Sequence, residues 1–119
     1  MLGESNGGAT QAWRAFARDG YTVVCLEGEL EGNSALQWGE ELLFLPDGDN
    51  PRVVLDLGGV SSMDSSTIGV LVFVDSQLRR RGGWLRLARV PPSAVQALET
   101  LALTDVLPTH ASVEEAVAV

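Results

Sequence analysis

Residues 53–83 constrain the fold of this 119-residue chain more than any other segment. They read VVLDLGGVSSMDSSTIGVLVFVDSQLRRRGG: an apolar run, a stretch of small and hydroxyl-bearing residues, and a second apolar run that ends in three arginines and two glycines. This order predicts a buried strand over residues 52–57, a loop over residues 58–64 and a helix over residues 65–81. A strand followed directly by a helix is the repeating unit of a parallel α/β sheet.

The second apolar run also has features of a strand, because several of its residues are β-branched and alternate. Its two ends favour a helix. Asp64 offers a side-chain acceptor to the first free N–H groups, and the arginines before Gly82 suit the negative end of the helix dipole. As a helix, the run places two faces side by side: Ile68, Leu71, Val72 and Leu78 on one, and Ser66, Gly69, Val70 and Phe73 on the other.

The rest of the chain alternates strands with helices. The pair Asp19-Gly20 predicts a hairpin, whereas residues 27–33 break the strand pattern. Further strands are expected at residues 12–18, 21–26, 84–90 and 107–109, and further helices at residues 35–45, 91–101 and 113–119. The predicted fold is α/β: a mostly parallel sheet of about four to five strands with an antiparallel N-terminal hairpin, packed against about four helices.

Composition limits the classes of function. Residues 1–11 are rich in glycine, serine and asparagine and are predicted to be a disordered leader, with residues 12–119 forming one domain. A net charge of −8 argues against direct nucleic-acid binding, and no apolar run is long enough for a membrane span. The single cysteine, Cys25, lies in an apolar run, which predicts a buried thiol and fits a cytoplasmic location.

Catalytic chemistry has few candidate residues. His110 is the only histidine, and the sequence contains no lysine, phosphate-binding loop, dinucleotide fingerprint or GxSxG elbow. We therefore expect no metal, no cofactor and no enzymatic activity. Asp56 and Asp64 are the one candidate carboxylate pair, although a strand-end cap or a loop hydrogen bond is the ordinary explanation for both.

The hydroxyls that follow Asp64 have two interpretations. Ser65 and Ser66 are preferred cap residues at the start of a helix. The same position favours a phosphate once it is attached, because free N–H groups and the helix dipole stabilise negative charge there. The two roles are compatible for one serine.

Three segments resemble the STAS domain family, and within it the bacterial anti-sigma factor antagonists. Residues 28–30, Gly-Glu-Leu, resemble the family's Gly-Glu-Leu-Asp signature. Residues 53–57, VVLDL, resemble its central strand, and residues 63–71, MDSSTIGVL, are similar to its Asp-Ser-Ser/Thr-Gly-Leu-Gly phosphorylation motif. The resemblance extends over residues 12–119 and implies a STAS-like version of the α/β fold predicted above.

In this family the serine directly after the aspartate is the phosphorylation site, which implies Ser65 here. The resemblance implies that an anti-sigma factor serine kinase modifies Ser65, that the unphosphorylated form binds this kinase and frees a sigma factor, and that a serine phosphatase restores that form. The phosphosite environment would consist of Asp64, Ser66, Thr67 and Glu31. The partner would bind at Ser66, Gly69, Val70 and Phe73.

Two residues depart from the family pattern. Thr67 stands where the motif has glycine, and Glu31 stands where the signature has aspartate. An alternative function is a non-phosphorylated STAS interaction subunit of a larger signalling scaffold or a lipid-transport ATPase complex, in which the same helix face is a permanent docking surface. The Asp64-Ser65 pair favours the switch, and Thr67 favours the alternative.

Overall fold

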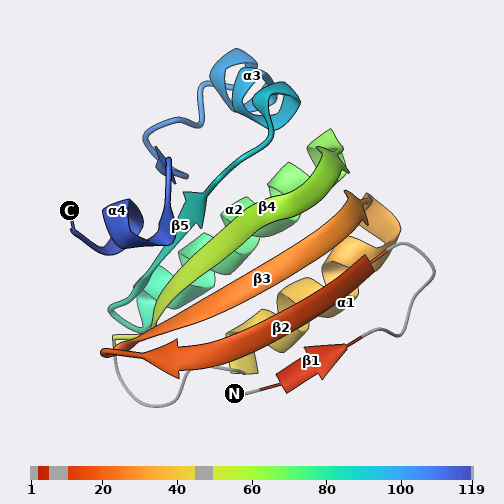
Figure 1. Cartoon of the computed structure of the whole chain (residues 1–119). Helices are drawn as coiled ribbons and strands as arrows, with labels where there is room; N and C mark the ends of the chain where they lie inside the picture. Colours follow the sequence, from red (N-terminus) through yellow and green to blue (C-terminus); the bar gives the residue numbers. More distant parts are fainter. Residues whose placement is uncertain (1–2, 6–10, 45–49, 119) are drawn as a thin grey trace.

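A computed structural model describes residues 3–5, 11–44 and 50–118 of the chain (Figure 1). It contains one six-stranded sheet in which the strands lie side by side in sequence order, β1 to β6. The elements are β1 (Gly3–Ser5), β2 (Gln11–Arg18), β3 (Tyr21–Leu30), α1 (Gly32–Phe44), β4 (Arg52–Met63), α2 (Ser65–Arg80), β5 (Trp84–Ala88), α3 (Pro92–Thr100), β6 (Thr109–His110) and α4 (Val113–Ala118).

The pairing of the strands confirms the predicted fold class. Strands β1, β2 and β3 pair antiparallel, whereas β3, β4, β5 and β6 pair parallel. Helices α1 and α2 pack side by side on one face of the sheet, and α4 packs on the opposite face beside β5 (Figure 1). Because β4 leads directly into α2, the end of the central strand and the start of this helix form one corner of the molecule.

The main core lies between the sheet and helices α1 and α2. Alternate residues of β4 point into it and are fully buried, as expected for a central strand covered on both faces. Of the α2 face predicted to hold Ile68, Leu71, Val72 and Leu78, only Val72 is half-exposed and the others are buried. The buried residues of α2 are Thr67, Ile68, Val70, Leu71, Val74, Asp75 and Leu78.

Two segments that were expected to be irregular, residues 27–33 and 58–64, are partly strand, because residues 27–30 pair with residues 59–63. Strand β3 continues to Leu30 and β4 continues to Met63, which lies opposite Leu30 in a parallel ladder. Two register shifts interrupt this ladder, and Gly28 lies at the second with a φ of 91°, a conformation that glycine adopts readily. The loop prediction was wrong because each segment, poor in strand-forming residues, obtains its backbone partners from the other.

Part of the predicted disordered leader is a strand. Gly3–Ser5 form β1, which pairs with β2 so that Gly3 lies opposite Ala15, and Gln11 already belongs to β2. Main-chain hydrogen bonds along a sheet edge require no particular side chains, so composition gave no sign of this pairing. The remaining leader residues, 1–2 and 6–10, lie outside the described part of the chain.

The side chain of Asp75 links α2 to β5 of the sheet. This side chain is buried, accepts a hydrogen bond from the Leu85 N–H at 3.2 Å, and pairs with the Arg79 guanidinium at 2.8 Å. We expect Asp75→Ala to lower the free energy of unfolding by about 1–2 kcal/mol, because it leaves a buried N–H without an acceptor. Arg79→Ala, the matched control, should cost less than Asp75→Ala, because it removes a mostly exposed side chain and leaves the Leu85 N–H with its acceptor. Urea denaturation measures both, and equal losses would contradict this assignment.

Candidate functional site

The N-terminus of α2 is held by its own cap. Asp64 has extended backbone angles, and its Oδ1 accepts a hydrogen bond from the Thr67 N–H at 2.8 Å. Its carbonyl oxygen accepts from the Ile68 N–H at 3.2 Å, which closes the first helical turn. Ser65 is therefore the first residue of the helix, and it is exposed.

Thr67 connects this cap to the end of β3. Its side chain is completely buried, and its hydroxyl oxygen lies 2.7 Å from Asp64 Oδ1 and 3.0 Å from the Leu30 carbonyl oxygen. A hydroxyl has one proton, so it donates to one of these acceptors at a time or shares the proton between them. The Asp64 N–H also donates to the Leu30 carbonyl, at 3.2 Å. The backbone on both sides of Ser65 is thus tied to the sheet.

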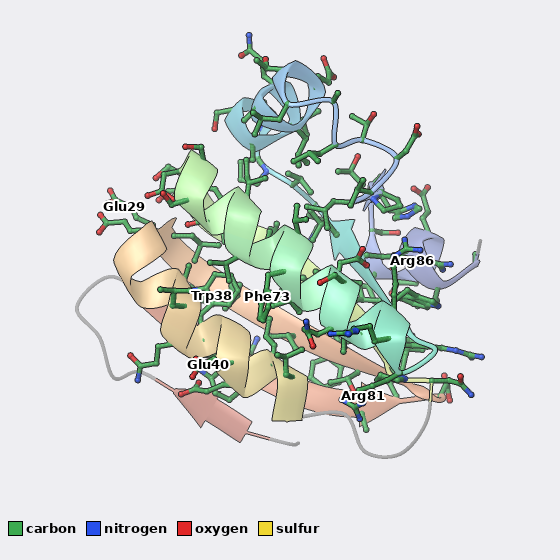
Figure 2. All side chains as sticks on the ribbon, turned by 180° about the vertical axis from the view of Figure 1, so that it is seen from behind. Glu29, Trp38, Glu40, Phe73, Arg81 and Arg86 are labelled. Carbon is green, nitrogen blue, oxygen red and sulfur yellow. The ribbon has the colours of Figure 1, made fainter. Side chains whose placement is uncertain are left out.

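Beside this cap lies an open cavity of about 410 Å³, which we call the acidic hollow. It lies where β3 and β4 end and α2 begins, and Figure 2 shows Glu29 at this end of the molecule. The lining residues are Glu29, Leu30, Glu31, Ser62, Met63, Asp64 and Ser66. Three carboxylate-bearing side chains therefore line the same hollow as Ser66, the residue next to Ser65.

The hollow contains predicted and unpredicted residues. Glu31, Asp64 and Ser66 were expected near Ser65, and the structure brings them together. Glu29 and Ser62 were missed because both fall in segments that were expected to be irregular, whereas they are paired in the β3–β4 ladder. Local propensity gives no signal for this contact, since the two residues are far apart in the chain.

The predicted partner-binding set divides into exposed and buried members. Ser66, Gly69 and Phe73 are exposed along α2 and form what we call the α2 stripe; 51% of Phe73 is accessible. Val70 is different, because it is only 9% exposed and belongs to the core. It packs against Gly39 of α1, where a Cβ on the glycine would lie 2.6 Å from Val70 Cγ1. Helical spacing placed Val70 beside the stripe but could not show that α1 covers it.

The candidate carboxylate pair does not form. Asp56 lies on the other face of the sheet, where its two oxygens accept hydrogen bonds from Arg89 Nε and Nη2, each at 2.9 Å. Asp56 Oδ1 also accepts from the Gly58 N–H at 3.0 Å. Asp64 instead lines the acidic hollow. Within the described residues, no group of three or more histidine, cysteine and carboxylate side chains is arranged to hold a metal ion.

The sequence profile of the STAS domain matches residues 12–116, from the hairpin to the last helix. The chain belongs to the STAS domain family.

Similar proteins share both sequence and fold with this STAS domain. BtrV of Bordetella bronchiseptica, assigned as an anti-sigma factor antagonist, is 33% identical over 100 residues, which cover 84% of this chain and 86% of BtrV. The crystal structure of an anti-sigma factor antagonist from Mycobacterium paratuberculosis has a TM-score of 0.79 at 18% identity and covers 92% of each chain. Unphosphorylated SpoIIAA, another anti-sigma factor antagonist, has a TM-score of 0.71 at 20% identity, covering 88% of this chain and 92% of its own.

The described residues of this STAS domain include no helix that is both long enough and apolar enough to cross a membrane.

His110 lies in β6, where its carbonyl oxygen accepts from the Arg89 N–H at 3.0 Å. His110 is thus part of an edge strand of the sheet, and it does not line the acidic hollow.

Cys25 of this STAS domain is half-buried on the same sheet face as Asp56. Burial raises the pKa of its thiol, and the nearby Asp56 carboxylate raises this pKa further. The neutral thiol is therefore favoured in the fold, and its contribution to stability is lost as pH rises through the thiol pKa. We expect native Cys25 to react with iodoacetamide at about pH 8 roughly tenfold more slowly than in the urea-unfolded chain. Equal rates would contradict the burial.

Proposed function

We propose that this chain is an anti-sigma factor antagonist that acts as a phosphorylation switch. Its unphosphorylated form binds an anti-sigma factor that is also a serine kinase, and so releases a sigma factor. Phosphorylation of Ser65 ends this binding, and a serine phosphatase restores it. The observation that carries the proposal is the position of Ser65, an exposed hydroxyl at the start of a long helix whose preceding residue, Asp64, is held by the sheet.

The named relatives support this proposal. BtrV, one-third identical to this chain, is assigned as an anti-sigma factor antagonist. SpoIIAA, which has the same fold, has been determined in a form named as unphosphorylated, so phosphorylation distinguishes two states of that protein. The Asp64-Ser65 pair lies at the corner where such a modification would reach solvent.

The local geometry suits phosphoryl transfer to Ser65. The serine oxygen would attack the terminal phosphorus of ATP, the bond from that phosphorus to the bridging oxygen would break, and the serine proton would pass to a base of the kinase. Asp64 Oδ1 is occupied by Thr67, so we assign Asp64 a positioning role. It holds the Ser65 backbone in a fixed position, which reduces the conformational entropy that this segment must lose when it binds the kinase.

The charge around Ser65 explains how a phosphate would act as a switch. A phosphoserine carries about −1.5 to −2 charges, and here it would stand beside the acidic hollow. The helix N-terminus tolerates that charge. A kinase docked over the α2 stripe would still hold ADP, whose phosphates face the modified serine. Repulsion between these anions favours dissociation.

The position of Thr67 bears on the alternative function, a non-phosphorylated interaction subunit. Thr67 favoured a non-phosphorylated interaction subunit because a larger residue was expected at the surface near Ser65. Thr67 is instead completely buried, so its methyl group adds no bulk to the surface that a kinase would approach. This observation supports the phosphorylation switch over a permanent subunit of a signalling scaffold or lipid-transport ATPase complex.

Mass spectrometry tests the proposal directly. The protein is incubated with ATP, Mg²⁺ and the anti-sigma factor kinase encoded in the same genome. We expect one phosphate, on Ser65, and none on Ser65→Ala. Ser66→Ala is the matched control, because Ser66 is the neighbouring exposed serine, and it should still accept the phosphate. A phosphate on Ser66, or no phosphate on the wild-type chain, would contradict the proposal.

A further inference from the structure

The sheet face opposite α1 and α2 gathers most of the positive charge of this acidic chain. The chain has eight basic residues, all of them arginines, against sixteen acidic ones. Strand register places Arg14 and Arg18 on the same face as Cys25 and Asp56, and the side chain of Arg89 reaches Asp56 there. The five arginines on this surface, which we call the arginine face, are Arg14, Arg18, Arg52, Arg86 and Arg89.

Part of the arginine face is open. Helix α4 covers its β5 side, where Arg86 stacks over Trp84 at 3.8 Å and donates to the Ala116 carbonyl oxygen. No helix of the described chain lies over the β2–β3 side (Figure 1). Arg14 and Arg18 are exposed there and Arg52 is exposed at the start of β4, and none of the three forms an ion pair with another described residue.

The open side also has an apolar floor. A cavity of about 320 Å³ lies between β2, β3 and α4, with Phe16 and Val23 as its apolar strand residues and Arg18 and Arg89 among its charged ones. Phe16 and Cys25 are partly exposed. Arginines around aromatic and aliphatic side chains are a composition that protein–protein interfaces favour. Strands β2 and β3, of 8 and 10 residues, present a platform of roughly 25 Å by 10 Å, which is enough for one extended segment.

We propose that the arginine face is a second docking surface, which accepts an extended acidic segment of a partner protein. The exposed guanidinium groups of Arg14, Arg18 and Arg52 supply the complementary charge, and the cavity receives an apolar side chain. A nucleic acid fits less well, because Asp56, Glu27 and Glu114 lie among the arginines and would meet its regularly spaced phosphates. The face lies across the sheet from α2, so both surfaces can be occupied at once.

Fluorescence anisotropy tests this surface with a short labelled peptide of alternating glutamate and valine, added to the unmodified full chain. We expect a Kd below about 1 mM that weakens with added salt. Arg18→Glu should weaken binding about tenfold, whereas Arg80→Glu, an equal charge change at the exposed end of α2, should change it less than about twofold. Thermal melts confirm that both variants fold.

Four outcomes would overturn the proposal, and three of them are measured as affinities. These three are absence of peptide binding, equal weakening by the two variants, and tighter binding of single-stranded RNA or anionic lipid vesicles than of the peptide. In the fourth outcome, adding the peptide shifts the NMR signals of amides on α2 instead of those on β2 and β3, which would place the peptide on the other face of the sheet. Because the chain is unmodified throughout, a failure of Ser65 phosphorylation leaves this result unchanged, and the two proposals fail separately.

Discussion

Ser65→Asp is expected to bind the anti-sigma factor kinase about 100-fold more weakly than Ser65→Ala, a difference of about 2.7 kcal/mol. The aspartate adds a permanent negative charge where α2 begins, beside the three carboxylates of the acidic hollow. A docked kinase would bury this charge against its own nucleotide phosphates, and a buried charge without a partner is costly. Ser65→Ala removes the phosphate acceptor but leaves the exposed surface otherwise unchanged, so it should bind as the unphosphorylated chain does.

Isothermal titration of the two variants with the kinase and ADP measures this difference. Ser62→Asp serves as the matched control, since Ser62 also borders the hollow but lies on β4 rather than at the helix start. It should weaken binding by less than about tenfold. If Ser65→Asp and Ser65→Ala bind equally well, the charge on residue 65 does not control the partner, and the switch is wrong.

Asp64→Ala is expected to lower the free energy of unfolding by about 2–3 kcal/mol. The substitution removes the acceptor of the Thr67 N–H and, with it, one of the two acceptors of the buried Thr67 hydroxyl. Loss of a helix cap costs about 0.5–2 kcal/mol, and the weakened hydroxyl adds to this. Asp64→Asn retains a side-chain oxygen for the Thr67 N–H and should lose less than about 1 kcal/mol. Asparagine removes the charge but keeps the capping oxygen, whereas alanine removes both. Urea denaturation of the two variants therefore distinguishes the contribution of the cap to stability from that of the charge.

The same pair of variants defines the role of Asp64 in phosphorylation. If Asp64 acts by positioning Ser65, Asp64→Asn should keep the phosphorylation rate within about threefold of the wild type, whereas Asp64→Ala should lower it at least about tenfold. Thr67→Val provides an independent test, because it removes only the hydroxyl that holds Asp64 and Leu30. A large loss of rate in Asp64→Asn, with stability intact, would instead assign a chemical role to the carboxylate.

Several features of the site were predictable because they depend on neighbouring residues. The cap at Asp64, the helix that follows and the position of Ser65 at its start all follow from a few consecutive side chains. The hairpin at Asp19-Gly20 is equally local, and its strands pair with Arg18 opposite Tyr21. The motif that resembles the STAS phosphorylation site is continuous in sequence, so the family could be expected before the fold was known.

The other features depend on contacts between distant segments. Val70 and Phe73 are both apolar residues of one helix, yet α1 buries the first and leaves the second exposed. Glu29 and Ser62 reach the same hollow only through the β3–β4 ladder. Helical periodicity assigns residues to faces, but it does not say which face a neighbouring element covers.

The sequence by itself determined the fold class, the capped helix and the candidate phosphosite, since each is written in a short continuous pattern. The tertiary structure alone decided that residues 58–63 continue β4, that Thr67 points inward to join Asp64 to Leu30, and that five arginines share one face of the sheet. The physical reason is that parallel pairing joins segments about thirty residues apart, and their register, which no local propensity specifies, sets the face on which each side chain lies.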